Sequence, residues 1–437
     1  MALAWILIAG FLVMFMQAGF ALVETGFCRA KNAVHTMGMN LVIYPLGVIG
    51  FWLVGYGLML GGVDRWPQLG SPVGSAHEVG LTIGGHTFGL FGAAKFALVS
   101  VARDPSSLAM FLFAAVFMDT AATIPTGAMA ERWKFLAFVI YGLFMSMLLY
   151  PLYGNWVWGG GWLSQLGAVG LGHGHVDFAG SSVVHMTGGV TALAGTMILG
   201  PRVGKFRRDG TILAMPGHNL PFSVIGTFIL AFGWFGFNAG CTLSPNDPRI
   251  ATIAVNTLLA SSAGALAALL YVWSTVRKPD VGMACNGLLG GAVAITAPCA
   301  FVGPASAALI GVVAGLLVAF GVTTLERRFR IDDPVGAISV HGLCGAWGAL
   351  AVGLLADGTY GDGWNGVAGP VRGLVFGDAS QLAAQAIGVV TNAAFVFGAS
   401  YGFFWIVERV VGTRVSAEVE WAGLDSLEMG SEAYPPG

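Results

Sequence analysis

Two histidines occupy matching places in two apolar stretches of the sequence. His185 lies in the segment DFAGSSVVHMTGG, and His341 lies in the segment DPVGAISVHGLCG. In each segment an aspartate, Asp177 or Asp333, stands eight residues before the histidine, and a glycine stands four residues after it. A neutral imidazole can accept a hydrogen bond or take up a proton, and ionisable residues inside a membrane are usually functional. The pair therefore indicates a site that handles a proton or a small polar solute.

The two aspartates have a simpler explanation than the histidines. Eight helical residues rise by about 12 Å, so each aspartate falls near one end of its stretch and each histidine toward the middle. A carboxylate at a helix N-terminus accepts hydrogen bonds from free backbone N–H groups. Capping is the favoured interpretation for Asp177 and Asp333, and a functional role stays open for Asp177.

Aromatic side chains form the remaining constellation. Phe113 and Phe117 are four residues apart, which places them on one face of a helix. The segment GWFGFNAGC supplies Trp234 and Phe237, and the segment NWVWGGGW places Trp158 before three glycines. An aromatic face attracts cations, but aromatic residues at span ends also form interfacial belts. At this point both interpretations stay open for Trp158.

Membrane-spanning helices must position these residues, because the composition excludes a soluble protein. Of the 437 residues, 56% are apolar and only 10% are charged, whereas a soluble domain carries about 25% charged residues. The net charge of −2 offers no basic surface for nucleic acid. Eleven stretches are apolar and long enough to cross a bilayer. They cover residues 3–27, 38–61, 108–130, 133–153, 176–200, 219–241, 250–276, 281–301, 305–326, 334–356 and 379–410.

The placement of positive charge supports this count. The loops after odd-numbered spans, together with the tail, hold 15 of the 20 lysines and arginines. We therefore expect a protein of the cell membrane. The positive-inside rule places its N-terminus outside the cell and its C-terminus in the cytoplasm. The run 84–102 is short, rich in glycine and contains Lys95, and we predict a helix lying in a surface loop there. A twelfth span at this run would reverse the side of every later loop.

The eleven spans divide into two blocks of five and a long final helix. The two histidine segments are the fifth spans of the blocks 1–5 and 6–10, and blocks with an odd number of spans enter the membrane in opposite directions. Transporters built from such inverted repeats place the substrate path between them. We expect an all-α integral membrane protein with eleven transmembrane helices, in which the two histidines meet. Residues 1–411 form the transmembrane domain, and the tail 412–437 is either a disordered end or a docking segment.

No cofactor or metal site is predicted. The five cysteines form no CxxC pair and lie mostly in apolar runs, where they pack as small side chains. His173 and His175 in the sequence GHGH are expected to belong to a flexible outer-loop tract rather than to a metal site. A retinal protein would need a lysine buried in a span, and no candidate for one is found.

Seven segments resemble the ammonium transporter family, the Amt, Mep and Rh proteins, and they occur in the family's order. They are RAKN (29–32), GAMAER (127–132), VWGGG (157–161), DFAGSSVVH (177–185), GWFGFNAG (233–240), DDP (332–334) and SVHGLCG (339–345). The resemblance covers about residues 1–432, including the tail segment 423–434. It implies a homotrimer in the lipid membrane with one narrow pore in each subunit. The resemblance also implies that the protein is not an enzyme. It also implies a cytoplasmic face that can bind a PII-type signalling protein.

The resemblance implies an outer recruitment site for ammonium. Trp158 and Phe113 match the residues that line this site, and Asp177 matches the buried carboxylate that shapes it. Cys241 takes the place of the family's usual serine. Because a thiol is a weak donor and acceptor, recruitment would depend more on Trp158 and on backbone carbonyls.

The resemblance also implies the parts of the pore below this site. Phe117 and Phe237 resemble the aromatic gate, and His185 and His341 resemble the paired pore histidines. Thr296 matches a threonine near the pore in the eighth span. A further departure is Asp119, two residues after the gate phenylalanine. It should face away from the pore and bond a neighbouring helix or subunit, because two helical residues turn by about 200°.

The expected mechanism follows from the cost of moving a charge through the membrane. A bare cation at the bilayer centre costs roughly 2.5–3.5 kcal/mol on insertion scales. Ammonium can release a proton and cross as ammonia, whereas potassium cannot. Two alternatives stay open: a non-transporting ammonium sensor that needs an output partner, and an electroneutral gas channel of the Rh type. Trp158 and the GWFGFNAG segment favour the Amt branch.

Overall fold

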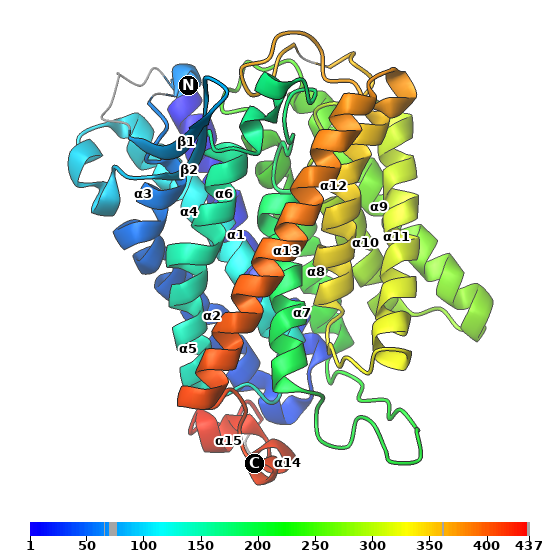
Figure 1. Cartoon of the computed structure of the whole chain (residues 1–437). Helices are drawn as coiled ribbons and strands as arrows, with labels where there is room; N and C mark the ends of the chain where they lie inside the picture. Colours follow the sequence, from blue (N-terminus) through cyan, green and yellow to red (C-terminus); the bar gives the residue numbers. More distant parts are fainter. Residues whose placement is uncertain (65, 70–76, 361, 435–437) are drawn as a thin grey trace.

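The eleven expected spans are all present in the computed structural model, which describes residues 1–64, 66–69, 77–360 and 362–434 (Figure 1). Within these residues, ten helical stretches are long and apolar enough to cross a membrane. They are Ala2–Phe27, Ala30–Leu60, Pro105–Ala128, Phe135–Trp158, Ser181–Leu199, Leu220–Gly240, Ile250–Val276, Pro304–Arg327, Ile338–Leu355 and Ala379–Val410. A shorter apolar helix, Val281–Ile295, lies between the seventh and eighth of these. The chain is therefore an all-α, multi-pass membrane protein.

Seven spans are single α-helices, and four are composite. The single helices are α1 (Ala2–Phe27), α4 (Pro105–Ala128), α8 (Leu220–Gly240), α9 (Ile250–Val276), α10 (Val281–Ile295), α11 (Pro304–Arg327) and α13 (Ala379–Val410). The composite spans join an α-helix to a π-helical turn. They are α2 (Ala33–Gly50), η2 (Phe51–Gly55) and α3 (Tyr56–Leu60); α5 (Phe135–Phe144), η5 (Met145–Leu149) and α6 (Tyr150–Trp158); η7 (Ser181–Met186) and α7 (Thr187–Leu199); and η8 (Ile338–Leu343) and α12 (Cys344–Leu355).

Two spans illustrate why a helix can be shorter than the apolar run that predicts it. The run 176–200 becomes helical only at Ser181, because Asp177 caps the chain there and Gly180 adopts a φ of 116° that favours glycine. The run 281–301 leaves the helix after Ile295 and continues in turns that contain Pro298. A proline has no backbone N–H to continue a helix. Hydropathy therefore overestimates both helices by including their apolar flanks.

The surface helix predicted for 84–102 is wrong for most of that run. Residues Glu78–Ile83 form β1 and residues His86–Gly92 form β2, which pair as an antiparallel hairpin; only Phe96–Val101 is helical, as the 3-10 segment η4. Gly84 and Gly85, with φ of 60° and 83°, form the two-residue turn. The prediction that this run does not cross the membrane is confirmed. We call the end of the bundle that carries this hairpin the outer end.

The two five-helix blocks pack against each other as an inverted repeat. The first helices of the blocks, α1 and α8, lie side by side and run in opposite directions. Gly26 near the end of α1 abuts Ser223 near the start of α8, and Gly236 near the end of α8 abuts Ala9 near the start of α1. At each place a Cβ atom on the glycine would collide with the neighbouring helix. The small residues therefore permit the close approach typical of membrane helices.

The fifth helices of the two blocks cross in the same antiparallel manner. A Cβ atom on Gly189 would lie 2.2 Å from the nitrogen of Gly342, and a Cβ atom on Gly345 would lie 2.4 Å from the carbonyl oxygen of Ser181. Gly189 and Gly345 are the two glycines that follow His185 and His341 by four residues. The repeated pattern around each histidine is thus explained by a close backbone crossing at the centre of the molecule.

The end of the bundle opposite the hairpin carries the tail, and we call it the inner end (Figure 1). The tail contains α14 (Ala417–Ala422) and α15 (Leu424–Glu428), and it is docked rather than free. The Asp425 carboxylate accepts hydrogen bonds from the backbone nitrogens of Val34 and His35 at the start of α2. Lys31 Nζ donates to the backbone oxygen of Glu420 at 2.8 Å. Residues 435–437 of the predicted tail lie outside the described residues.

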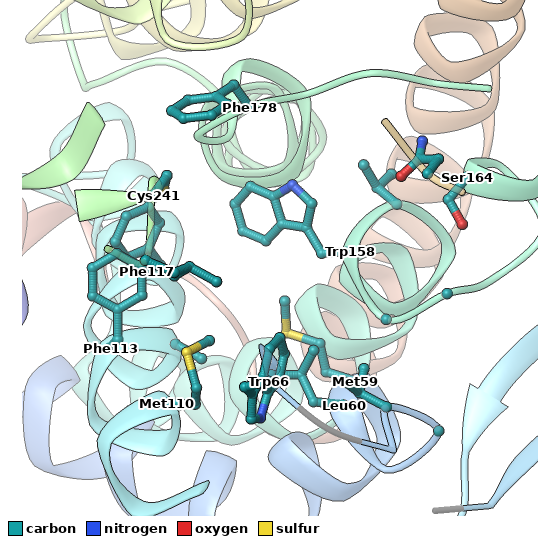
Figure 2. Close-up of a pocket in the computed structure, with 18 of the residues that line it drawn as sticks. Met59, Leu60, Trp66, Met110, Phe113, Phe117, Trp158, Ser164, Phe178 and Cys241 are labelled. Atoms are coloured by element: carbon teal, nitrogen blue, oxygen red, sulfur yellow. The ribbon is translucent and has the colours of Figure 1, made fainter. Parts of the chain in front are cut away.

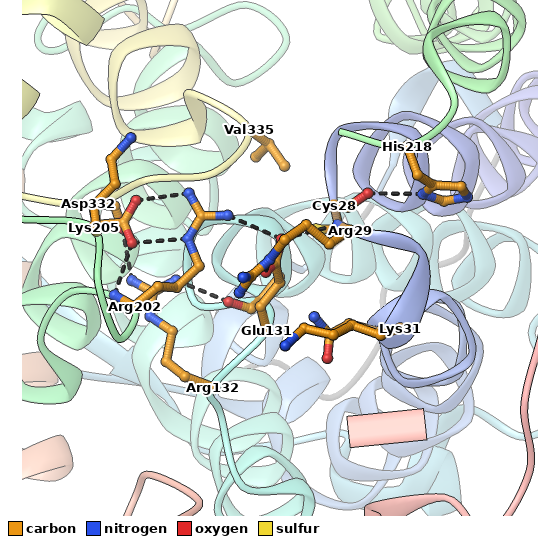
Figure 3. A network of polar contacts seen from close by, with 12 residues as sticks. Cys28, Arg29, Lys31, Glu131, Arg132, Arg202, Lys205, His218, Asp332 and Val335 are labelled. Atoms are coloured by element: carbon orange, nitrogen blue, oxygen red, sulfur yellow. Dashed lines mark hydrogen bonds and ion pairs between the residues drawn. The ribbon is translucent and has the colours of Figure 1, made fainter. Parts of the chain in front are cut away.

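Buried ion pairs fix the loops at the inner end (Figure 3). Glu131, in the left-handed conformation with φ 72°, receives Arg202 Nη1 at 2.9 Å and also pairs with Arg29. Arg202 binds Asp332 through two further nitrogens at 2.8 and 2.9 Å. Although burial raises the pKa of Asp332, hydrogen bonds from Arg202 hold it well below the ordinary value. The segments RAKN, GAMAER and DDP therefore meet in one structural clamp, away from the histidines.

Candidate functional site

A cavity of about 510 Å³ lies at the outer end of the bundle, and its walls are mostly apolar (Figure 2). The lining includes sulfur-containing and aromatic side chains, among them Met59, Trp66, Met110, Phe113, Phe117, Trp158, Phe178 and Cys241. Four of the residues assigned to recruitment and gating are therefore brought together, namely Phe113, Phe117, Trp158 and Cys241. A mainly apolar cavity with a few polar groups is the usual form of a small-molecule site. We call it the outer vestibule.

Trp158 is held across the vestibule by a hydrogen bond to the backbone. Its Nε1 donates to the carbonyl oxygen of Asp177 at 2.7 Å. Gly160, two residues after Trp158, has a φ of 86°, which allows the chain to turn sharply after α6. Figure 2 shows the indole between Phe178 and the Phe117 side of the vestibule. The ring is thus fixed from behind, and its face is free to meet a solute.

Asp177 is a capping residue in this structure. Its two carboxylate oxygens accept five hydrogen bonds, four from the backbone nitrogens of residues 180–183 and one from the Ser182 hydroxyl. The distances are 2.7 to 3.0 Å. Asp177 is buried and is not among the residues that line the vestibule. Of the two interpretations left open by the sequence, the geometry favours capping, and Asp177 contributes to the vestibule through the bond from Trp158.

A stacked aromatic pair separates the vestibule from the histidines. The ring centroids of Phe117 and Phe237 lie 4.0 Å apart with an interplanar angle of 26°. Phe113 lies above them, 4.7 Å from Phe117. On the other side, Phe237 stacks on His185 at 5.4 Å. Cys241, one turn after Phe237, turns its Sγ back to the Phe237 carbonyl at 3.3 Å. The stacked rings therefore lie between the vestibule and His185.

The two histidines meet below this pair. His185 Nδ1 and His341 Nδ1 are 3.2 Å apart, and the rings lie 5.3 Å apart at 27°. Both residues are buried, and each sits in a π-helical turn, η7 or η8. Since a hydrogen bond needs one donor, one Nδ1 carries a proton and the other does not. π-turns widen a helix locally and often occur at functional positions.

Thr296 lies near this pair without touching it. Trp234 stacks on His185 with a centroid separation of 5.2 Å. The indole Nε1 of Trp234 donates to Thr296 Oγ1 at 3.0 Å, and this hydroxyl donates to the carbonyl oxygen of Ala292. Thr296 therefore orients Trp234, and Trp234 forms the wall beside the histidine.

The flexible tract expected around His173 and His175 is wrong, because both residues are buried and hydrogen-bonded. His175 Nε2 lies 2.9 Å from the Ser182 hydroxyl, which itself donates to Asp177. Burial lowers the pKa of His175 to about 4, so the ring is neutral at physiological pH. Because the Ser182 hydroxyl gives its one proton to Asp177, it can only accept from His175. The protonated nitrogen of this neutral ring is therefore Nε2. The GHGH tract packs beneath the cap at Asp177, where glycine permits tight turns.

Among the described residues no group of three His, Cys, Asp or Glu side chains is placed to hold a metal ion.

Asp119 and Glu24 are two buried carboxylates outside the vestibule. Asp119 faces α2, where its Oδ1 would lie 3.8 Å from a Cβ on Gly47, and within the described residues this oxygen has no hydrogen-bond partner. It therefore faces α2 rather than Phe117. In the described part of the chain Asp119 makes no hydrogen bond to a neighbouring helix, and a bond to a neighbouring subunit stays a prediction. Glu24 was missed by motif reasoning. The only signal was an acidic residue inside the apolar run 3–27.

Comparison with known proteins agrees with this architecture. The model of the Ammonium Transporter Family matches residues 4–434. The ammonium transporter Amt2 of Archaeoglobus fulgidus is 47% identical over 435 residues, covering 99% of this chain and 87% of the relative. The ammonium transporter Amt1 of Haloferax mediterranei is 36% identical over 444 residues, covering 99% and 78%.

Solved structures show the same arrangement. A sensor Amt protein superposes with a TM-score of 0.84 at 34% identity, covering 98% of both chains. Mep2 of Candida albicans superposes with a TM-score of 0.80 at 26% identity, covering 95% of this chain and 86% of that structure. The match of sequence and fold extends over nearly the whole length, so this chain belongs to the ammonium transporter family.

Proposed function

We propose that this protein transports ammonium by separating it into ammonia and a proton inside the molecule. The observation that carries the proposal is the buried pair of histidines, 3.2 Å apart between Nδ1 atoms, directly behind the stacked rings of Phe117 and Phe237. A neutral imidazole in this position accepts a proton or a hydrogen bond. The second ring then offers the next acceptor, at hydrogen-bond distance.

Ammonium enters this scheme at the outer vestibule. The face of Trp158, with Phe113 opposite, attracts the cation through its π-electrons. The walls of the vestibule are mostly apolar, and desolvation strengthens such an attraction. Cys241 offers only a weakly accepting sulfur, and its Sγ is already directed to the Phe237 carbonyl. Recruitment therefore rests mainly on the aromatic rings and on backbone carbonyls.

Selectivity follows from what each ion can give up. The stacked rings of Phe117 and Phe237 exclude a hydrated cation. A cation that sheds its hydration shell to pass gains no compensating contacts from the apolar walls. Ammonium leaves its proton on the histidine pair and continues as ammonia, which needs little desolvation. Potassium has no proton to leave. The pore thus passes one ion and rejects another of similar size and charge.

The proposed assembly is a homotrimer in the cell membrane with one pore in each subunit. The outer end faces outward with the N-terminus, and the inner end with the docked tail faces the cytoplasm. This orientation is supported by the excess of lysine and arginine in the loops on the inner side. The loops and tail at this end would also be the surface for a PII-type signalling protein.

An ammonium jump on proteoliposomes attached to a solid-supported membrane tests the proposal. A concentration step of ammonium should produce a transient current, whereas an equal step of potassium should produce none. A pH-sensitive dye inside the vesicles reports ammonia entry in the same preparation. Ammonia entry without current would indicate an electroneutral gas channel. A potassium current of similar size would contradict the proposed deprotonation step.

A sensor is the second candidate, and one observation favours keeping it. The solved structure that superposes with a TM-score of 0.84 is a sensor Amt protein. A sensor would bind ammonium in the vestibule without flux. Binding detected by a change in tryptophan fluorescence, with neither current nor ammonia entry, would establish this alternative.

A further inference from the structure

A carboxylate stands in the first membrane-spanning helix without a cation beside it. Glu24 lies near the inner end of α1 and is 2% exposed. Among the described residues, the ion pairs of the molecule do not include it. An ionisable side chain is expensive inside a membrane and tends to mark a position of function. The vestibule, the stacked rings and the histidine pair leave this group unused.

A small cavity connects Glu24 to the histidine pair. It measures about 20 Å³, and both Glu24 and His341 line it. Phe20, one turn before Glu24 on the same face of α1, lies 6.0 Å from the His341 ring. A single water molecule needs roughly 10–15 Å³ of such space and two to four polar partners. The carboxylate, the imidazole and the amide of Asn286, which also lines the cavity, are the polar groups that one water could join.

The hydrogen bonds around Glu24 allow it to exist with or without a proton. Asn40 Nδ2 donates to Glu24 Oε2 at 2.6 Å, and Thr126 Oγ1 lies 2.7 and 2.9 Å from the two carboxylate oxygens. Thr126 Oγ1 also lies 2.5 Å from the carbonyl oxygen of Thr123. One hydroxyl proton cannot serve all three acceptors.

Two arrangements satisfy this geometry. When Glu24 is ionised, the Thr126 hydroxyl donates to the carboxylate. When Glu24 is protonated, its O–H donates to Thr126 Oγ1, and the threonine hydroxyl turns to the Thr123 carbonyl. A rotation of one hydroxyl therefore accommodates the gain or loss of a proton, with no movement of the backbone.

From these contacts we infer that Glu24 accepts the proton that leaves His341, through a water molecule in the cavity, and passes it to the inner end. The inference rests on the proposed function, in which the proton of ammonium reaches the histidine pair. The His341 N–H bond breaks as the cavity water takes its proton, and another proton of that water forms an O–H bond on the Glu24 carboxylate. The Glu24 O–H then gives its proton to water at the inner end, where the proton recombines with ammonia. The carboxylate is restored, and one ammonium has crossed in two parts.

The test compares current with ammonia entry in proteoliposomes of the full chain. Glu24→Gln keeps the shape of the side chain and an oxygen for Asn40, but it cannot take up a proton. We expect the ammonium-induced current to fall about tenfold or more, while ammonia entry, read from the internal pH dye, is retained. Glu24→Asp, which restores a carboxylate, should recover part of the current. Glu418→Gln, on the exposed helix α14, is the matched control and should behave as the unmodified protein.

The outcomes separate this inference from the proposed function. A Glu24→Gln protein that keeps the full current would overturn the role of Glu24 and leave the transport proposal standing. A Glu24→Gln protein that loses current and ammonia entry together, with no recovery in Glu24→Asp, would assign Glu24 to the structure of the pore. An unmodified protein that passes ammonia without any current would refute the transport proposal itself, whatever Glu24 does.

Discussion

The same local device holds both histidines, one in each half of the inverted repeat. In the first half Asp177 caps the turn η7 with five hydrogen bonds, and His185 follows in that turn. In the second half Asp333 caps the turn η8 with three hydrogen bonds from backbone nitrogens, and His341 follows in that turn. The repeat therefore reproduces the cap, the π-turn and the ring.

The surroundings of the two rings differ. The helix α8 presents Trp234 and Phe237 to His185, which leaves only apolar surface toward the vestibule. The helix α1 presents Phe20 to His341 and, one turn later, the carboxylate of Glu24. A duplicated scaffold has thus acquired an apolar outer half and a polar inner half. In the transport proposal, this difference places a proton acceptor, Glu24, on the inner side of His341.

The largest expected effect comes from removing both rings. In His185→Leu/His341→Leu the pore keeps its apolar volume but loses its proton acceptors. We expect the ammonium current to fall by about 10²–10⁴-fold, the usual worth of positioned acid–base groups, or a potassium current to appear. His86→Leu, exposed at the start of strand β2, is the control. Unchanged current and unchanged selectivity in the double variant would show that the two histidines are not the proton acceptors of the pore.

The unequal caps predict unequal losses of stability. Asp177→Ala leaves five donors without their acceptor and should lower the free energy of unfolding by about 2 kcal/mol or more. Asp333→Ala removes three bonds and should cost less, about 1–2 kcal/mol. Thermal unfolding in detergent, followed by tryptophan fluorescence, measures both. An equal or larger loss for Asp333→Ala would show that the outer cap is not the more tightly built half.

Recruitment by the outer half predicts a change in apparent affinity. Trp158→Leu removes the aromatic face while keeping an apolar side chain. Loss of a cation–π contact worth about 0.5–2 kcal/mol corresponds to a rise in apparent KM of roughly 2–30-fold, with less effect on the maximal current. Trp421→Leu, exposed at the inner end, is the control. A fall in maximal current at constant KM would place Trp158 in gating instead.

The smallest effect is expected at Cys241. In Cys241→Ser the hydroxyl can donate to the Phe237 carbonyl, as the thiol does, and still accept a hydrogen bond from ammonium. A gain of about 0.5–1.5 kcal/mol would lower the apparent KM by roughly two- to tenfold. An unchanged or higher KM, measured from the concentration dependence of the current, would mean that this position does not touch the cation.

The spans and the histidine repeat could be predicted because each rests on a strong signal. Long apolar runs identify membrane helices wherever they occur, and the matched Asp-x₇-His spacing identified the two segments that cross. The hairpin at Glu78–Gly92 was missed because hydrophobic periodicity alone does not tell a strand from a helix in a short apolar run. Only the two adjacent glycines at the turn, Gly84 and Gly85, marked the difference.

The burial of His175 and the hydrogen bond from Trp158 to the Asp177 carbonyl needed the structure. Both depend on where the chain before η7 folds back, and no periodic pattern describes such a segment. The cavity beside Glu24 was equally out of reach, because Glu24, Asn286 and His341 come from three distant parts of the chain. A single acidic residue in an apolar run raises the question of function but does not name its partner.

The most direct test of the central claim is a count of charges for each nitrogen transported. Uptake of isotopically labelled ammonium and the integrated current would be measured on the same proteoliposomes, with potassium on both sides. Separation of ammonium into ammonia and a proton that both cross predicts one elementary charge for each nitrogen. Nitrogen uptake that carries no charge would contradict it.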